Sequence, residues 1–98
     1  MKYAIIARDG EGMLEKRLAV RQTHMERLQK ADGKIVCAGG LLDEEGKMKG
    51  SVIIMDFETK EALDNYLKNE PYMAEGVWES VDVEVMNVVF LDGEKIGK

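Results

Sequence analysis

The order of strand-like and helix-like segments restricts the fold of this 98-residue chain more than any other feature. Strands are predicted at 2–8, 34–42, 50–57 and 80–90, where apolar and β-branched residues gather between turn residues. One helical segment lies between the first two strands and a second between the last two. The resulting order, β-α-β-β-α-β, predicts an α+β, ferredoxin-like domain with one antiparallel four-stranded sheet and two helices on one face.

The two helical segments have recognisable ends. The first is predicted from Leu14 to about residue 31, where an Asp-Gly pair follows. The second starts after Thr59, a residue type favoured as an N-cap, and ends before Pro71. Residues 71–76 are then expected to form one more helical turn, with proline in the first position and Gly76 as its stop. The whole chain is expected to be one domain, residues 1–98, with 91–98 as a polar tail.

The sheet face opposite the helices is predicted to pack on a second copy of the chain. Apolar residues occupy consecutive positions in 3–7 and 52–55, and Met86, Val88, Val89 and Phe90 are apolar on both sides of the last strand, so both faces of these strands are apolar. Two helices cover one face only, and a large bare apolar patch is uncommon on a monomer. We therefore expect a homodimer, and the alternative is a monomer with an uncovered apolar face.

Composition excludes several classes of function. The chain has 14 Lys and Arg against 19 Asp and Glu, a net charge of −5, so no general attraction to nucleic acid or anionic membrane is expected. The apolar run 3–7 is shorter than the roughly 7–15 residues of a secretory signal, and no run approaches the roughly 20 residues that span a bilayer. Because Cys37 is the only cysteine, no intrachain disulfide can form. A soluble cytoplasmic protein is the expectation.

No metal or cofactor is expected either. One histidine and one cysteine cannot form a zinc site within a single chain. The glycines match neither a dinucleotide-binding fingerprint nor a phosphate-binding loop, and no calcium-binding loop occurs.

Polar residues of the first helix lie on or beside its predicted apolar stripe. At about 100° per residue, the stripe is centred about 65° from Arg17, while Arg21 lies at about 40° and His24 at about −20°. The stripe consists of Leu14, Leu18, Met25 and Leu28. A charged side chain on a core-facing stripe needs a partner or an anion. These residues are therefore candidates for ligand binding, and the alternative is a structural ion pair for Arg21 and a half-buried, hydrogen-bonded His24.

Two segments resemble the YciI-like (YCII-related) family: LEKRLAVRQTHMERL at 14–28 and NEPYMAEGVWESVDV at 69–83. The family's Arg-x-x-His corresponds to Arg21 and His24, and its Asp-Pro-aromatic followed by a glycine corresponds to 70–72 and Gly76. Gly50 matches a glycine that opens the third strand of the family. The resemblance extends from residue 3 to residue 90. It implies a ferredoxin-like fold, a homodimer whose sheets pack face to face, and a site centred on a histidine and an aspartate. One relative is a dehydrochlorinase that acts on a hydroxylated aromatic compound.

The chain departs from the family pattern at two places. Glycine follows Gly39 where the family has proline, and Glu70 stands where the family has aspartate. Aspartate before Pro71 could act only as an N-cap, but glutamate is not a favoured N-cap. A position that needs a carboxylate would accept the exchange, so we expect a His24–Glu70 pair.

These residues favour an enzyme that transfers protons on a small anionic or hydroxylated molecule without a cofactor, by elimination, isomerisation or hydrolysis. His24 is the candidate base or acid, because its ordinary pKa is near neutrality, and Glu70 would orient it. Arg21 and Arg17 would bind a substrate carboxylate or a developing enolate, and Tyr72 and Trp78 would wall the pocket. The alternatives are a non-catalytic dimeric protein that binds a small ligand, and a structural dimer in which Arg21 and His24 serve only the fold.

Overall fold

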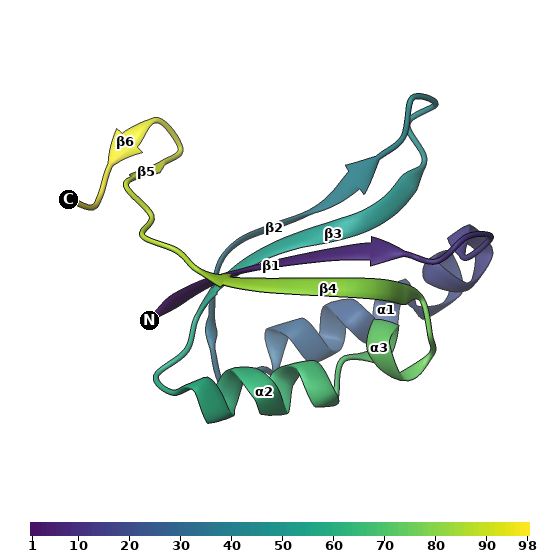
Figure 1. Ribbon diagram of the computed structural model, residues 1–98, viewed down its shortest axis with the longest axis horizontal. Helices are drawn as coiled ribbons and strands as arrows, with labels where there is room; N and C mark the ends of the chain where they lie inside the picture. Colours follow the sequence, from purple (N-terminus) through teal and green to yellow (C-terminus); the bar gives the residue numbers. More distant parts are fainter.

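The computed structural model describes all residues 1–98 and contains the predicted ferredoxin-like arrangement (Figure 1). The four-stranded sheet has the order β2-β3-β1-β4, and every neighbouring pair is antiparallel. Its strands are β1 (Lys2–Asp9), β2 (Lys34–Leu42), β3 (Met48–Asp56) and β4 (Trp78–Val85). The helices are α1 (Leu14–Gln29), α2 (Lys60–Lys68) and the one-turn α3 (Pro71–Ala74). All three lie on the same side of the sheet. No helix is both long enough and apolar enough to cross a bilayer.

Strand alternation places the core between the sheet and the helices. In β1, Tyr3, Ile5 and Ala7 are buried while the residues between them are partly exposed, and β3 buries Ile53 and Met55 in the same way. The helical side adds a second set of buried residues: Leu28, Phe57, Leu63, Tyr66, Tyr72 and Val77. Each large apolar side chain buried here contributes about 1.5–3 kcal/mol, so this layer holds the fold together.

The predicted ends of the second helical region are confirmed. The Thr59 side chain accepts a hydrogen bond from the Ala62 backbone N–H at 3.1 Å and so caps α2. Pro71 occupies the first turn of α3, where its missing N–H leaves no intrahelical bond unmade. Gly76 follows α3 with a φ of 73°, a left-handed conformation that favours glycine.

The predicted buried face of α1 is wrong in part: Leu28 is buried as expected, but the rest of the face differs. Leu18 is 57% exposed and Met25 is 37% exposed, whereas the buried residues of α1 are Arg17, His24 and Leu28. The helix is therefore rotated so that Arg17 and His24 point at the sheet together with Leu28, while Leu18 points to solvent. This is tolerated because both polar side chains find partners inside the protein, as described below, and a buried polar group is costly only when it is unpaired.

The predicted last strand is wrong at its C-terminal end. β4 stops at Val85, residues 86–89 form no strand, and the chain ends in a hairpin of β5 (Phe90–Leu91) and β6 (Glu94–Lys95). The hairpin turns at Asp92-Gly93, whose φ values of 51° and 80° suit a tight two-residue connection. In Figure 1 it projects from the body of the domain, on the side of the sheet away from the helices. The predicted polar tail, residues 91–98, thus contains strand structure, and the hairpin exposes the apolar side chain of Phe90.

The helix-free face of the sheet has an apolar centre and an acidic edge. Ile6 pairs with Val52 across β1 and β3, and Ile54 lies on the same face; all three are half-buried in the single chain. Asp82 and Glu84 of β4 point to this face as well, because they pair with residues 6 and 4 of β1. No element of the chain covers this centre.

Candidate functional site

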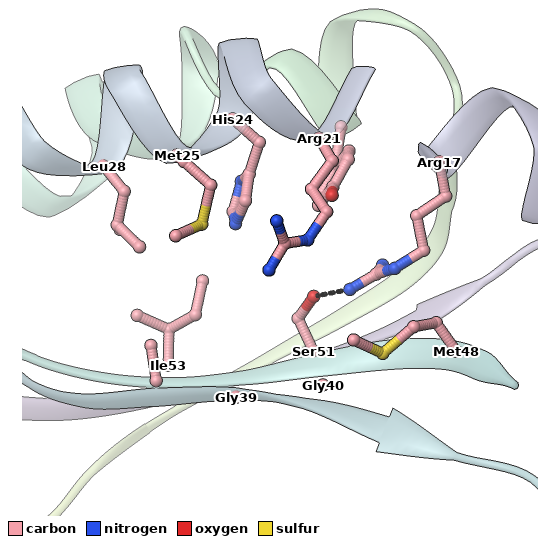
Figure 2. A pocket seen from close by; sticks show the side chains of 12 residues that line it. Arg17, Arg21, His24, Met25, Leu28, Gly39, Gly40, Met48, Ser51 and Ile53 are labelled. Atoms are coloured by element: carbon pink, nitrogen blue, oxygen red, sulfur yellow. Dashed lines mark hydrogen bonds between the residues drawn. The ribbon is translucent and has the colours of Figure 1, made fainter. Parts of the chain in front are cut away.

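A cavity of about 150 Å³ lies between α1 and the β2–β3 part of the sheet (Figure 2). Cavities of about this size in proteins accommodate one benzene ring. Helix α1 and the strands contribute most of the residues that line it: Arg17, Arg21, His24, Met25, Leu28, Ala38, Gly39, Gly40, Met48, Ser51, Ile53 and Tyr72. Figure 2 shows Leu28, Met25 and Ile53 at one end and the arginines with Ser51 at the other, with His24 between them. The cavity is therefore apolar at one end and polar at the other.

His24 and Glu70 form the predicted pair. His24 Nδ1 lies 2.5 Å from Glu70 Oε1, His24 is 6% exposed, and the Glu70 carboxylate is completely buried. A carboxylate only accepts hydrogen bonds, so Nδ1 carries the proton and Nε2 keeps its lone pair when the imidazole is neutral. Because Nδ1 is occupied by Glu70, Nε2 is the nitrogen available to a ligand in the cavity.

Two further donors complete the surroundings of Glu70. Tyr66 donates its phenolic hydrogen to Oε2 at 2.5 Å, and the backbone N–H of Tyr72 donates to Oε1 at 3.2 Å. Burial, followed by the charge of Glu70 and the hydrogen bond to it, raises the pKa of Tyr66 far above its ordinary value, so the phenol remains a donor. Three donors therefore hold the carboxylate in one orientation without a lysine or arginine bonded to it.

Glu70 is an N-cap and a histidine partner at the same time. Its backbone is extended, and the Oε1 atom that accepts from His24 also accepts from the backbone N–H of Tyr72, the second residue of α3. The expectation treated capping and pairing as alternatives, and the structure combines them. The longer glutamate side chain allows this, because it reaches α1 while it still turns back to its own helix.

Arg17 forms a buried ion pair. Its Nη1 donates to both carboxylate oxygens of Asp9, at 2.9 and 3.2 Å, and its Nη2 donates to the Gly50 carbonyl at 2.9 Å and to Ser51 Oγ at 2.7 Å. Burial raises the pKa of Asp9 despite the neighbouring guanidinium, which lowers it. Arg17 lines the cavity, but its charge is already paired inside the protein.

Tyr72 and Trp78 stand beside the histidine. The Tyr72 ring stacks on His24 with 4.1 Å between ring centres, and the Arg17 guanidinium lies 4.6 Å from the centre of the same ring. Trp78 meets both rings edge-on, at 6.2 Å from His24 and 5.7 Å from Tyr72. Tyr72 lines the cavity, whereas Trp78 packs against its wall and is not among the lining residues. Both residues fix the plane of the imidazole.

Arg21 differs from Arg17 because it has no partner. It forms no ion pair or hydrogen bond in the protein, its side chain is exposed, and in Figure 2 its guanidinium points from α1 toward the strands. The cavity therefore has an unpaired cation beside His24.

Three residues of the site escaped the sequence analysis: Ser51, Tyr66 and Asp9. Ser51 had a usable signal, since strand alternation places it on the same face as Ile53 and Met55, where a polar side chain is out of place. Tyr66 also had a usable signal, because it lies four residues before Glu70, a spacing at which helical side chains can meet. Asp9 follows the apolar part of β1 and gave no signal of its pairing with Arg17.

Fold and site together define a ferredoxin-like α+β protein with a buried histidine–carboxylate pair at a cavity large enough for one ring. The YCII-related domain matches residues 1–87. The chain belongs to the YCII-related family, as its sequence resemblance indicated.

Two bacterial relatives match over nearly their whole length. Protein YciI of Escherichia coli O6:H1 is 37% identical, across 92% of this chain and 100% of the relative. An uncharacterized protein of Haemophilus influenzae is 36% identical with the same coverage. Neither name states an activity, and both matches agree with the family assignment.

One solved structure resembles the whole domain closely and contains a ligand. It is the 5-chloro-2-hydroxyhydroquinone dehydrochlorinase TftG from Burkholderia phenoliruptrix AC1100, in complex with 2,5-dihydroxybenzoquinone. Its TM-score is 0.80 at 25% sequence identity, over 89% of this chain and 94% of that one. This neighbour is an enzyme that binds a small hydroxylated quinone.

Proposed function

We propose that this protein is a cofactor-independent enzyme that moves protons on a small hydroxylated or anionic ring compound, with His24 as the base and Glu70 as its orienting carboxylate. The observation that carries the proposal is the buried His24–Glu70 hydrogen bond, which leaves Nε2 as a base directed at a ring-sized cavity. The similarity to a dehydrochlorinase of hydroxylated rings supports the same class of chemistry.

The proposed reaction begins with proton transfer to His24 Nε2 from an acidic O–H, or from a C–H beside a carbonyl. The electron pair left behind moves onto oxygen and forms an enolate or phenolate, which the Arg21 guanidinium stabilises. In an elimination, that electron pair returns to the ring and expels an anion from the adjacent carbon. In an isomerisation, His24 returns its proton to a different carbon. Glu70 stabilises the imidazolium that exists between these steps.

A panel of small ring compounds tests the proposal directly. The purified protein would be mixed with hydroxylated benzenes, hydroxyquinones and aromatic carboxylates, and its unfolding temperature measured. Compounds that raise it would then be followed for conversion by chromatography. Conversion that is lost in His24→Gln supports the enzyme. Stabilisation without conversion favours a binding protein, and the absence of both favours a structural protein.

We also propose that the protein is a homodimer formed through the helix-free face of the sheet. The half-buried apolar centre at Ile6, Val52 and Ile54 supports this, as does the exposed Phe90 on the hairpin that projects to the same side. Residues 86–90 do not form the strand with two apolar faces that the sequence predicts, but Phe90 and Ile96 of the C-terminal segment remain exposed in the single chain.

Val52→Lys should convert the dimer into a monomer. Val52 points away from the helices, so a lysine there would place two charges at the centre of a symmetric interface. Light scattering should give about twice the 11.0 kDa chain mass for the native protein and one chain mass for the variant. Thr23→Lys, on the exposed side of α1, is the control and should remain a dimer. A monomer mass for the native protein at micromolar concentration would refute the interface.

A further inference from the structure

The polar end of the cavity contains two hydrogen-bond donors that no group of the protein uses. Arg21 has no internal partner, as described above. Ser51 is 3% exposed and lines the cavity, and its Oγ accepts a hydrogen bond from Arg17 Nη2. The Ser51 hydroxyl donates no hydrogen bond within the protein.

Arg17 determines whether the Ser51 hydroxyl donates or accepts a hydrogen bond in the cavity. A serine hydroxyl has one donor hydrogen and two lone pairs, and a guanidinium can only donate. Arg17 therefore occupies a lone pair of Ser51, and the hydroxyl hydrogen is left for a group in the cavity. Arg17 in turn is fixed by Asp9. The buried Asp9–Arg17 ion pair thus fixes the orientation of the Ser51 hydroxyl and leaves its hydrogen free to donate.

We propose that Arg21 and Ser51 form a subsite for an anionic oxygen of the substrate, so that the preferred substrate is a single ring with a carboxylate, enolate or phenolate group. This deepens the proposed function and rests on it. The anionic group lies against Arg21 and Ser51, and the ring lies against Leu28, Met25 and Ile53 at the apolar end. His24 lies between the two ends, where it can take a proton from a ring C–H or O–H next to the anionic group.

The chain contributes no negative side chain to this subsite. No Asp or Glu lines the cavity, and both carboxylate oxygens of Asp9 are bonded to Arg17. Glu70 lies behind His24 with both oxygens occupied by donors. A ligand anion would therefore meet donors only, and a charge-assisted hydrogen bond is about twice as strong as a neutral one.

Binding of benzoate and benzamide tests the subsite without any turnover. The two molecules have nearly the same shape and differ in charge. Trp78 is the only tryptophan and lies beside the cavity wall, so its fluorescence can report both dissociation constants. The native protein should bind benzoate at least about 10-fold more tightly than benzamide.

The variants separate the roles of the two donors. Arg21→Gln should reduce the preference for benzoate to about 3-fold or less, because the charge is gone and no fold contact is lost. Ser51→Ala should weaken both ligands by about 5-fold, since either can accept from the hydroxyl. Ser51→Cys keeps an acceptor for Arg17 and should weaken both ligands less. Lys16→Gln also removes one positive charge, but from the exposed side of α1. It and Ser80→Ala on β4 are the matched controls, and neither should change the two dissociation constants.

Several results would overturn the subsite. These are equal affinity of the native protein for the two ligands, absence of benzoate binding at millimolar concentration, an undiminished preference in Arg21→Gln, or an equal loss in Lys16→Gln. His24→Gln distinguishes this inference from the proposed function. It should retain the preference for benzoate, because both donors are intact, while turnover is lost.

Discussion

Turnover should fall by about 10²–10⁴-fold when His24 is replaced by glutamine, which is the usual contribution of a positioned general base. Glutamine can still donate a hydrogen bond to Glu70, so the buried carboxylate keeps a partner, but it has no basic nitrogen to direct at the cavity. The measurement is kcat for whichever ring compound the panel identifies, together with the unfolding temperature of the variant.

The control for this experiment is Thr23→Ala, the neighbouring exposed position of α1, which should leave kcat unchanged. Tyr66→Phe is an informative companion. It removes one of three hydrogen bonds to Glu70 without touching the cavity, so it should lower kcat more than it raises KM. A folded His24→Gln protein with full turnover would contradict the assignment of His24 as the base.

Arg17→Met should lower the free energy of unfolding by about 3–5 kcal/mol at neutral pH, the usual cost of removing one partner from a buried ion pair. The loss has three parts: Asp9 becomes a buried unpaired charge, and the Gly50 carbonyl and Ser51 lose a donor. Urea unfolding would measure it. The double variant Asp9→Asn with Arg17→Met should recover a large part of the lost free energy of unfolding, because it removes the uncompensated negative charge of Asp9.

The same variant should respond to acid in a defined direction. Burial already raises the pKa of Asp9 with Arg17 in place, and loss of the guanidinium removes what lowers it. A carboxyl with a folded-state pKa above its unfolded value binds its proton more tightly when folded. The destabilisation of Arg17→Met should therefore shrink as pH falls from neutrality toward the unfolded value of about 3.9. If the destabilisation of Arg17→Met is the same at every pH in this range, Asp9 is not the source of the lost free energy of unfolding.

The fold was predictable because local signals agreed with the global arrangement. Turn residues, the Thr59 cap and Pro71 divided the chain correctly, and the alternation of β1 and β3 identified the core. The C-terminal hairpin was missed because three of the four residues 86–89 are apolar, as in a strand, although the segment leaves the sheet after the hydrogen bond from the Met86 N–H to the Lys2 carbonyl of β1. Strand formation depends on a partner, and an apolar run alone does not reveal whether one exists.

The site was predictable in part, and its exact geometry was not. The family motifs indicated His24 and Glu70, and the structure joins them. The apolar stripe of α1 did not predict the buried face correctly. The usual rule places leucines toward the core, but here Arg17 and His24 are buried and Leu18 is exposed. Which of two arginines is paired internally depends on Asp9, a residue on another element, so sequence spacing could not separate Arg17 from Arg21.

Glu70 both caps α3 and pairs with His24, and this affects how substitutions in proteins that evolve from this chain should be interpreted. A lineage that lost the activity would still need Glu70 to begin α3 and Tyr66 and His24 to satisfy its buried carboxylate. Selection for folding alone would then preserve most of the site. Arg21 bonds to nothing in the protein and would be free to drift in such a lineage. Under the proposed function, the residue at position 21, more than the histidine, is therefore expected to distinguish a catalytic member of the family from one that has kept only the fold.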